Sequence, residues 1–171
     1  DGRFGGALLL SPNDQNCERL DFGIYPSLND ELSLSFWFQS DREDTRATFF
    51  YAQDDDENTG WAIHSQHNAH APPWARFNVG RWGNTSWETR DDWTHMVFTY
   101  DFATGVQKVY QDGILRVYSV DDLPQSGGVP HLRFSGNLNS YGYRGRLDDV
   151  ALYNRTLNSD EVWALYHQAA G

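Results

Sequence analysis

The chain has 171 residues, which is enough for one domain with a buried core, so we expect residues 1–171 to form a single domain. Its 24 Asp and Glu against 13 Lys and Arg give a formal net charge of −11, which argues against nucleic acid and anionic membranes as partners. No apolar run is long enough to insert into a membrane, and the single cysteine, Cys17, excludes an internal disulfide.

Short apolar or alternating runs, separated by frequent turn signals, predict β-strands along nearly the whole chain. In chain order, strands are expected within residues 5–10, 32–39, 61–66, 74–82, 93–101, 109–110, 115–117 and 143–153, and a helix within 159–168. Asp112-Gly113 is the clearest hairpin turn, and Ser159 is the expected N-cap of the helix. The sequence therefore predicts an all-β fold, an antiparallel sandwich of two sheets with one short C-terminal helix.

Alternation of apolar and polar residues assigns a core face and an opposite face to several strands. In 32–39, the even-numbered apolar residues are expected in the core and Trp37 on the other face. In 74–82, Phe77 and Val79 supply the core side, which leaves two tryptophans, an arginine and an asparagine on the other side.

Exposed indoles beside planar hydrogen-bonding groups suit a sugar, because a pyranose has an apolar face that stacks and hydroxyls that need donors and acceptors. The residues expected to bind an oligo- or polysaccharide are Trp74, Arg76, Asn78, Trp82, His64, Gln66 and Trp37. The alternative is that a loop folds over this face and turns the tryptophans into secondary core.

The C-terminal part carries a family resemblance. Gly-Arg-Leu-Asp-Asp-Val-Ala-Leu-Tyr-Asn-Arg-Thr-Leu at 145–157, followed by Ser-Asp-Glu-Val at 159–162, resembles the closing strand and helix of laminin-G-like domains of the concanavalin A-like lectin/glucanase superfamily. Segments 5–10 and 32–38 resemble its opening strand and early core strand, and segments 93–101 and 109–113 resemble its central hairpin. The resemblance implies a jelly-roll sandwich, an extracellular or cell-surface location and a place in a larger multidomain chain.

The resemblance also implies a structural calcium ion as cofactor, held by an Asp at the start of the closing strand, which Asp148 matches. Partners from the N-terminal segment would be Gly6, through its carbonyl, and the side chains of Asn13 and Asp14. The acidic run 54–58 is a further place where relatives of this kind hold calcium, or it is a solvated loop.

Three other functions are weighed. Glycoside hydrolysis is rejected, because the paired carboxylates of the jelly-roll glucanases, Glu-x-Asp-x-x-Glu or Glu-x-Asp-x-Glu on one strand, do not occur. A small polysaccharide lyase stays possible, with His64, Gln66, Arg76, Asn78 and Tyr110 on one face as base and carboxylate neutralisers. Protein–protein adhesion is the other alternative. The expected function is a non-catalytic, lectin-like, calcium-stabilised carbohydrate-binding module.

Overall fold

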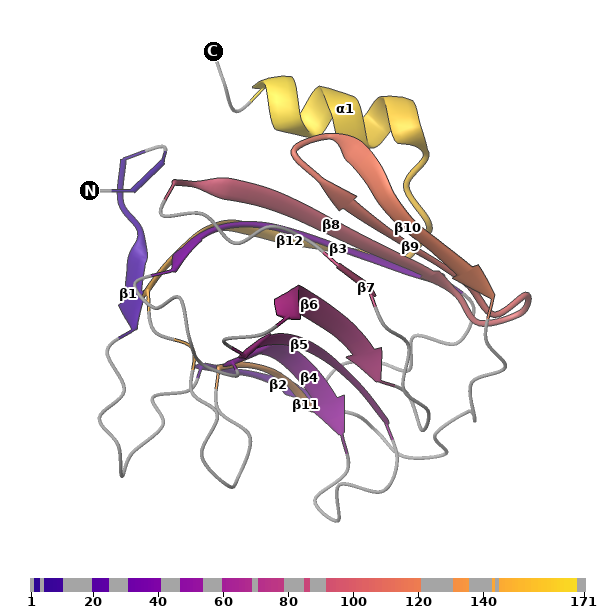
Figure 1. Cartoon of the computed structure of the whole chain (residues 1–171), viewed down its shortest axis with the longest axis horizontal. Helices are drawn as coiled ribbons and strands as arrows, with labels where there is room; N and C mark the ends of the chain where they lie inside the picture. The colour runs from indigo at the N-terminus through magenta and orange to yellow at the C-terminus, as the bar shows by residue number, and fades with distance from the viewer. Residues whose placement is uncertain are drawn as a thin grey trace.

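The computed structural model describes residues 2–3, 5–10, 20–24, 31–40, 47–53, 60–68, 71–78, 85–86, 92–120, 131–135, 143 and 145–168. Two six-stranded antiparallel sheets pack face to face, with one helix on the outer side of one of them (Figure 1). The predicted all-β sandwich with a single short C-terminal helix is confirmed.

Sheet I has the strand order β1-β12-β3-β8-β9-β10, and sheet II has the order β2-β11-β4-β5-β6-β7. The strands of sheet I are β1 (Leu8–Leu10), β3 (Glu31–Ser40), β8 (Thr94–Asp101), β9 (Val106–Gln111), β10 (Ile114–Val120) and β12 (Gly145–Tyr153). Those of sheet II are β2 (Leu20–Ile24), β4 (Ala47–Gln53), β5 (Gly60–Asn68), β6 (Ala71–Asn78), β7 (Thr85–Ser86) and β11 (His131–Phe134).

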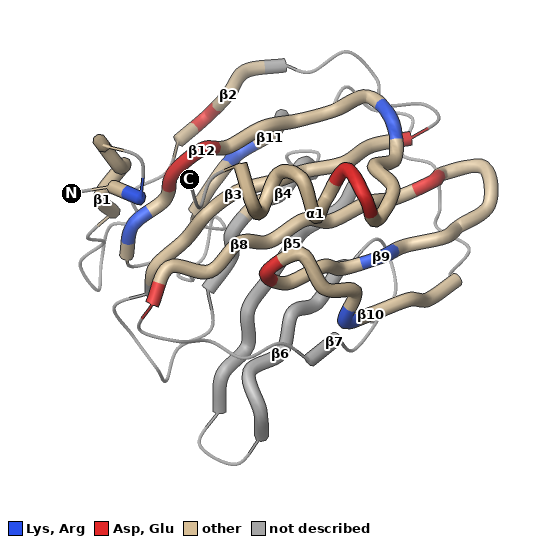
Figure 2. Tube along the Cα trace, turned by 90° about the horizontal axis from the view of Figure 1, so that it is seen from above, with Lys and Arg blue, Asp and Glu red and all other residues tan. Residues whose placement is uncertain are grey.

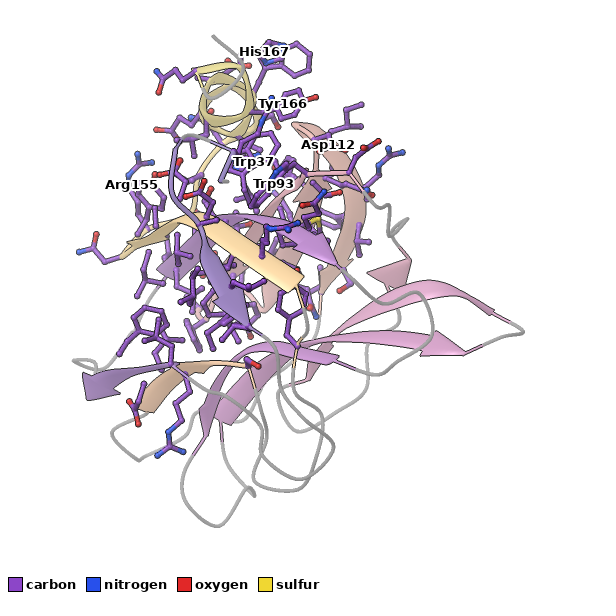
Figure 3. All side chains as sticks on the ribbon, turned by 90° about the vertical axis from the view of Figure 1, so that its left-hand side faces the viewer. Trp37, Trp93, Asp112, Arg155, Tyr166 and His167 are labelled. Carbon is purple, nitrogen blue, oxygen red and sulfur yellow. The ribbon has the colours of Figure 1, made fainter. Side chains whose placement is uncertain are left out.

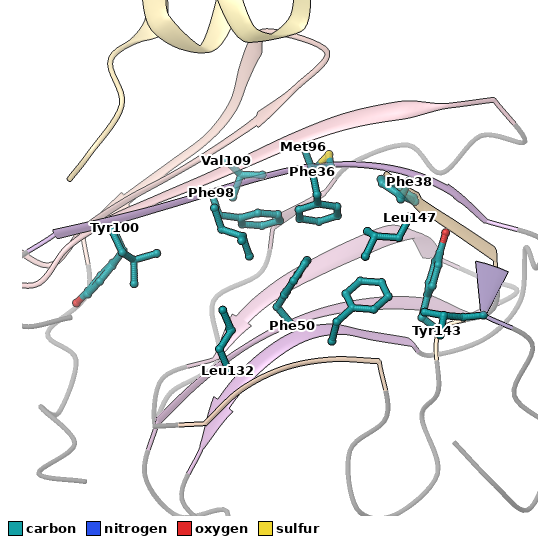
Figure 4. Close-up of a cluster of buried hydrophobic side chains, with 14 residues drawn as sticks. Phe36, Phe38, Phe50, Met96, Phe98, Tyr100, Val109, Leu132, Tyr143 and Leu147 are labelled. Atoms are coloured by element: carbon teal, nitrogen blue, oxygen red, sulfur yellow. The ribbon is translucent and has the colours of Figure 1, made fainter. Parts of the chain in front are cut away.

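The core lies between the sheets and is rich in aromatic side chains (Figure 4). On β3, alternate residues face inward, and Leu32, Leu34, Phe36 and Phe38 are all fully buried, as the alternation predicts. The rings of Phe36 and Phe50 lie 4.9 Å apart and join the two sheets. Fully burying an aromatic side chain contributes about 1.5–3 kcal/mol relative to leaving it exposed, so the burial of these two rings stabilises the packing of the sheets.

The predicted hairpin turn forms between β9 and β10. Asp112 and Gly113 both have positive φ, 51° and 77°, as a two-residue turn of this kind requires. The turn is joined to β8, because the backbone of His95 donates to Asp112 Oδ1 at 3.0 Å and its carbonyl accepts from the Asp112 N–H at 2.9 Å.

The helix α1 (Ser159–Gln168) lies on the outer face of sheet I, and seen from above it covers the middle strands of that sheet (Figure 2). Its N-cap is Asn158, whose Oδ1 accepts the N–H groups of Asp160 and Glu161 at 3.0 Å each. Glu161 Oε2 in turn accepts the Asn158 N–H at 2.8 Å, which completes a capping box. The expectation of Ser159 as N-cap is therefore wrong by one residue, because the asparagine side chain reaches the two donors that a cap must satisfy.

The connection from β12 to α1 is bonded to β3. Ser33 Oγ accepts the Leu157 N–H at 2.9 Å and donates to the Arg155 carbonyl at 2.8 Å. Glu31 accepts both the N–H and the hydroxyl of Thr156 at 2.6 Å, and these bonds hold the pKa of the Glu31 carboxyl below its usual range. The helix is thereby fixed in one place on the sheet.

Candidate functional site

The register of β5 and β6 brings most of the expected sugar-binding residues into one group of positions. His64 lies directly opposite Arg76, and Gln66 directly opposite Trp74. Opposed residues of an antiparallel pair share a face of the sheet. Asn78 is two positions from Arg76 on β6 and so occupies the same face. The sixth residue expected in this group, Trp82, lies outside the described residues.

This face is the one turned away from the core. Phe50 is fully buried, and the register continues from Phe50 to Ile63 on β5 and to Phe77 on β6. These three positions share the core face, so the neighbouring positions, those of His64 and Arg76, belong to the outer face of sheet II.

A second set of residues on the outer face crosses the sheet from strand to strand. Asp21 on β2 pairs with Arg133 on β11, Arg133 with Tyr51 on β4, Tyr51 with Ala62 on β5, and Ala62 with Asn78 on β6. The side chains of Asp21 and Arg133 meet in an ion pair, with Nε 3.1 Å from Oδ2. Only 10% of the Arg133 side chain is exposed, against 38% of the Asp21 side chain.

Sequence reasoning missed Asp21, Arg133 and Tyr51. A signal was present, since Arg133 stands between the buried Leu132 and Phe134 in a four-residue strand, and such alternation places the arginine on the non-core face. Taken together, the positions on the outer face of sheet II hold aromatic, amide, hydroxyl and guanidinium residues. These positions include Asp21, Thr48, Tyr51, Gln53, His64, Gln66, Trp74, Arg76, Asn78, Ser86, His131 and Arg133.

Trp37 does not belong to this group, and its expected place beside the other residues is a correction. It lies on β3 in sheet I and is 2% exposed. Tyr166 of α1 stacks on it with ring centroids 5.7 Å apart (Figure 3). The Arg3 guanidinium lies 5.0 Å from the Trp37 ring centroid. Alternation places Trp37 correctly on the non-core face, but the helix covers that face of sheet I.

Next to Trp37, β8 contributes a buried histidine. His95 is 2% exposed, its ring lies 4.9 Å from the Trp37 ring, and its Nε2 is 2.9 Å from Ser35 Oγ. Burial lowers the pKa of His95 to about 4, so the ring is neutral at pH 7. The Ser35–His95 pair is enclosed under α1 and is not open to a substrate.

The lyase alternative requires Tyr110 on the same face as His64 and Arg76. The structure instead places Tyr110 on β9 in sheet I, 1% exposed and packed with Val97, Leu157 and Val162 beneath α1. Tyr110 is therefore a core residue of the helix–sheet interface and is separated from the outer face of sheet II by the whole sandwich.

The expected calcium residues are described only in part. Asn13, Asp14 and the acidic run 54–58 lie outside the described residues. Asp148 is half-buried and immediately precedes a β-bulge, where the register with β3 shifts and Asp149 has a φ of 47°. β1 pairs with β12 from Leu8 opposite Leu147, the residue before Asp148, and Gly6 precedes β1 by two residues.

The groups around Asp148 meet only part of what a calcium site requires. A carboxylate next to a chain segment with backbone carbonyls is a suitable start for a hard oxygen site. However, Asp148 pairs with Trp37 on the outer face of sheet I, where the Arg3 cation lies over that ring. Among the described residues there is no group of three His, Cys, Asp or Glu side chains placed to hold a metal. The remaining ligands would have to be carbonyls or come from the N-terminal segment.

The comparisons with known proteins agree with the fold. Residues 18–163 match the family described as the concanavalin A-like lectin/glucanases superfamily, and the chain belongs to this family. A search of curated protein sequences finds no match. In the part of the chain that the structure describes, no helix is long and apolar enough to cross a membrane.

Similar solved structures include domain 4 of an extracellular arabinanase from Geobacillus stearothermophilus in complex with arabinotriose, with a TM-score of 0.75 and 23% identity over 97% of this chain and 79% of that one. A SAP-like pentraxin from Limulus polyphemus has a TM-score of 0.76 and 10% identity over 94% and 80% of the two chains. The CBM40 of a Ruminococcus gnavus sialidase, bound to α2,3-sialyllactose, has a TM-score of 0.64 and 10% identity over 80% and 83%. These likenesses establish the fold that the three proteins share with this chain.

Proposed function

We propose that this chain is a non-catalytic, lectin-like module that binds an oligo- or polysaccharide on the outer face of sheet II. The observation that carries the proposal is the register across five strands, which gathers indole, phenol, amide and guanidinium residues on one face. An indole can stack on the apolar face of a sugar ring, and the planar polar groups can bond its hydroxyls in pairs.

Two of the structural neighbours support this class of ligand, because the arabinanase domain was solved with arabinotriose and the CBM40 with sialyllactose. Both come from carbohydrate-active proteins, and one of these is named as extracellular. We therefore also propose a secreted or cell-surface location and a place within a larger multidomain protein.

Calcium is proposed as a structural ion at the β12 bulge, with Asp148, the Gly6 carbonyl, Asn13 and Asp14 as ligands. When bound, it would join the segment before β1 to β12 and so stabilise one edge of sheet I. The observation in favour is the pairing of β1 with β12 beside the bulge. The ion would act on folding stability and not on the sugar itself, because Asp148 lies in sheet I and the proposed binding face belongs to sheet II.

Protein–protein adhesion remains the second candidate, and a separate observation favours it. Five large apolar side chains on β10 and α1 are at least 45% exposed: Ile114, Leu115, Tyr118, Val120 and Trp163. Contiguous exposed apolar surface often marks a protein contact, and four of these five residues belong to the single strand β10. This set belongs to sheet I and α1, so it is separate from the outer face of sheet II.

Affinity gel electrophoresis on a panel of neutral and acidic polysaccharides, with calcium and with a chelator, tests the proposal. Retardation by at least one polysaccharide that is lost in Trp74→Ala and kept in Tyr118→Ser would support the outer face of sheet II. Tyr118 is the matched control because it is 60% exposed on β10 in the other sheet. If no polysaccharide retards the protein under either condition, the carbohydrate proposal is wrong and adhesion becomes the leading function.

A further inference from the structure

The helix α1 leaves the outer face of sheet I open along the edge strand β10, and the hairpin of β9 and β10 lies next to the helix (Figure 1). Tyr110 on β9 packs with Val162 of α1, so its position faces outward, whereas its neighbour Val109 belongs to the core between the sheets. The outward positions of β9 are therefore those of Tyr110 and, two and four residues before it, Lys108 and Val106.

Three residues of β10 face outward beside these positions, since opposed residues of an antiparallel pair share a face. The register with β9 gives three outward pairs: Leu115 with Tyr110, Tyr118 with Lys108, and Val120 with Val106. A bulge between Leu115 and Val117 takes up one extra residue, so Leu115, Tyr118 and Val120 occupy consecutive outward positions. These three side chains are 45%, 60% and 57% exposed, and we call them the β10 strip.

Trp163 of α1 extends the β10 strip at the end where the hairpin turns. Its side chain is 50% exposed, and a Cβ added to Gly113 in the turn would lie 3.0 Å from its Cε3 atom. The indole therefore rests on the turn, two residues before Leu115. A continuous row of exposed apolar side chains marks a contact surface, which single exposed side chains do not.

The β10 strip lacks negative charge in a chain whose net charge is −11. Neither β9 nor β10 contains an Asp or Glu, and the two strands contain Lys108 and Arg116. The carboxylates of Asp112 and Asp101, next to these strands, already accept a backbone N–H of β8 and the hydroxyl of a neighbouring turn. Because two copies of an acidic protein repel each other, contact between copies is favoured where carboxylates are missing.

The order of side chains makes the β10 strip complementary to itself. When β10 of a second copy lies antiparallel on it, with the twofold axis at Tyr118, the two Tyr118 rings meet at the axis. Leu115 of each copy then lies on Val120 of the other, because these residues are one outward position before and one after Tyr118. Lys108 stands beside Tyr118 and can place its ammonium over the phenol ring of the second copy. A contact of this kind uses the same surface on both copies and closes at a dimer.

From these observations we propose that the chain forms a twofold dimer through the β10 strip and Trp163, with the two β10 strands antiparallel across the axis. The inference goes beyond the proposed sugar binding and does not depend on it, because the β10 strip belongs to sheet I and the dimer leaves the outer face of sheet II of each copy uncovered. The strip is small beside the roughly 20–30 residues a side of a standard interface, so we expect a weak dimer with a dissociation constant on the order of 10–100 μM.

Sedimentation velocity of the whole chain, at concentrations up to about 1 mM, tests the dimer without any sugar. We expect a reversible change from monomer to dimer that strengthens as salt rises from about 0.1 to about 1 M, because the screening length falls from about 10 to about 3 Å and repulsion between the acidic copies is reduced. A monomer at every concentration and salt would overturn the inference and leave the β10 strip to a different protein. Growth into larger species would also overturn it, since a closed twofold contact stops at two copies.

Two substitutions at exposed positions test the proposed register. Leu115→Lys and Val120→Glu should each weaken dimerisation about tenfold or more, because each places a charge against an apolar side chain. An equimolar mixture of the two variants should restore the dimer, since the register puts the two new charges, of opposite sign, against each other. Leu9→Lys is the matched control, because Leu9 is 55% exposed on β1 at the opposite edge of sheet I, and the dimer should be unchanged.

Far-UV circular dichroism and thermal melting establish that each variant is folded. If Leu115→Lys and Val120→Glu dimerise like the wild type, the β10 strip is not the interface. If each variant is monomeric and their mixture stays monomeric, the antiparallel register about Tyr118 is wrong. Neither result bears on sugar binding by sheet II, which the gel experiment measures separately.

Discussion

Trp37 and His95 occupy directly opposed positions on β3 and β8, and Tyr166 of α1 covers both rings at centroid distances of 5.7 and 6.1 Å. The imidazole is buried, and its Nδ1 has no hydrogen-bond partner within the described part of the chain. The other nitrogen is bonded to Ser35. Charged groups near this pair are Asp112, whose carboxylate accepts from the His95 backbone, Arg3, whose guanidinium lies over the Trp37 ring, and Asp148, which stands opposite Trp37 on β12. A charged imidazole in this position would therefore lack a bonded carboxylate partner among the described residues.

The first prediction is a loss of stability in mild acid that depends on His95. Its pKa is about 4 in the folded protein against an ordinary value of 6.5, so the unfolded chain binds the proton first as the pH falls. His95 therefore does not lower the free energy of unfolding above pH 6.5. Below that pH it destabilises the folded protein, and the loss grows until about pH 4. The full difference corresponds to about 3 kcal/mol. Urea unfolding at several pH values between these limits measures it.

The variant His95→Gln should flatten this pH dependence, because glutamine does not titrate and can still bond Ser35. His167→Gln is the control, since His167 is an exposed histidine on α1 and its loss should leave the dependence as it is in the wild type. Equal slopes for wild type and His95→Gln would mean that other groups cause the acid sensitivity.

The second prediction concerns the helix cap. Asn158→Ala should destabilise the protein by about 1 kcal/mol, because it leaves the N–H groups of Asp160 and Glu161 without their acceptor. Ser159→Ala should have almost no effect, since Ser159 is not the cap. Denaturant midpoints at fixed slope compare the two variants, and a larger loss for Ser159→Ala would reverse the assignment.

The third prediction concerns the start of β12. Gly145 has a φ of 145°, and a Cβ at this position would clash with the Gln39 carbonyl oxygen and the Tyr143 hydroxyl. Gly145→Ala should therefore cost about 1–3 kcal/mol or more from the backbone conformation, with the clash in addition. Gly6→Ala is the control, because a Cβ added there would meet no other atom within 4 Å. Equal melting temperatures for the two variants would show that the backbone at Gly145 adjusts freely.

The fourth prediction concerns calcium. If the ion binds only the folded state, calcium at about one hundred times its dissociation constant adds about 2.7 kcal/mol of stability and raises the melting temperature. Asp148→Asn should remove that rise, whereas Asp92→Asn, an exposed aspartate just before β8, should keep it. A metal analysis of the purified protein accompanies the melts, so that an ion too tightly held for a chelator is still detected.

Much of the fold could be predicted from local patterns. The alternation in β3 identified the face turned to the core residue by residue, and Asp112-Gly113 identified its hairpin, because both signals lie within a few neighbouring residues. The packing of α1 over Trp37 could not be predicted in this way. A period of two says on which face of a sheet a residue lies but not whether a helix from the far end of the chain packs on that face.

Local spacing likewise predicts one part of the candidate site, and long-range strand pairing creates the other part. Trp74, Arg76 and Asn78 share one strand, so their common face follows from their spacing. Arg133 and Asp21 are 112 residues apart, and only the pairing of β11 with β2 brings them together. Long-range pairing of this kind depends on the whole packed sandwich, and a single sequence carries no local trace of it.

The last prediction separates the two faces of β6. Trp74→Ala should weaken polysaccharide binding about tenfold, equivalent to about 1.4 kcal/mol, with little change in the free energy of unfolding. Phe77→Ala should do the reverse, costing about 3–5 kcal/mol of stability, because its position aligns through Ile63 with the fully buried Phe50. Titration calorimetry and urea unfolding on both variants measure the two effects. If Trp74→Ala instead unfolds the protein while the remaining folded fraction binds normally, the indole belongs to a second core and the binding surface lies elsewhere.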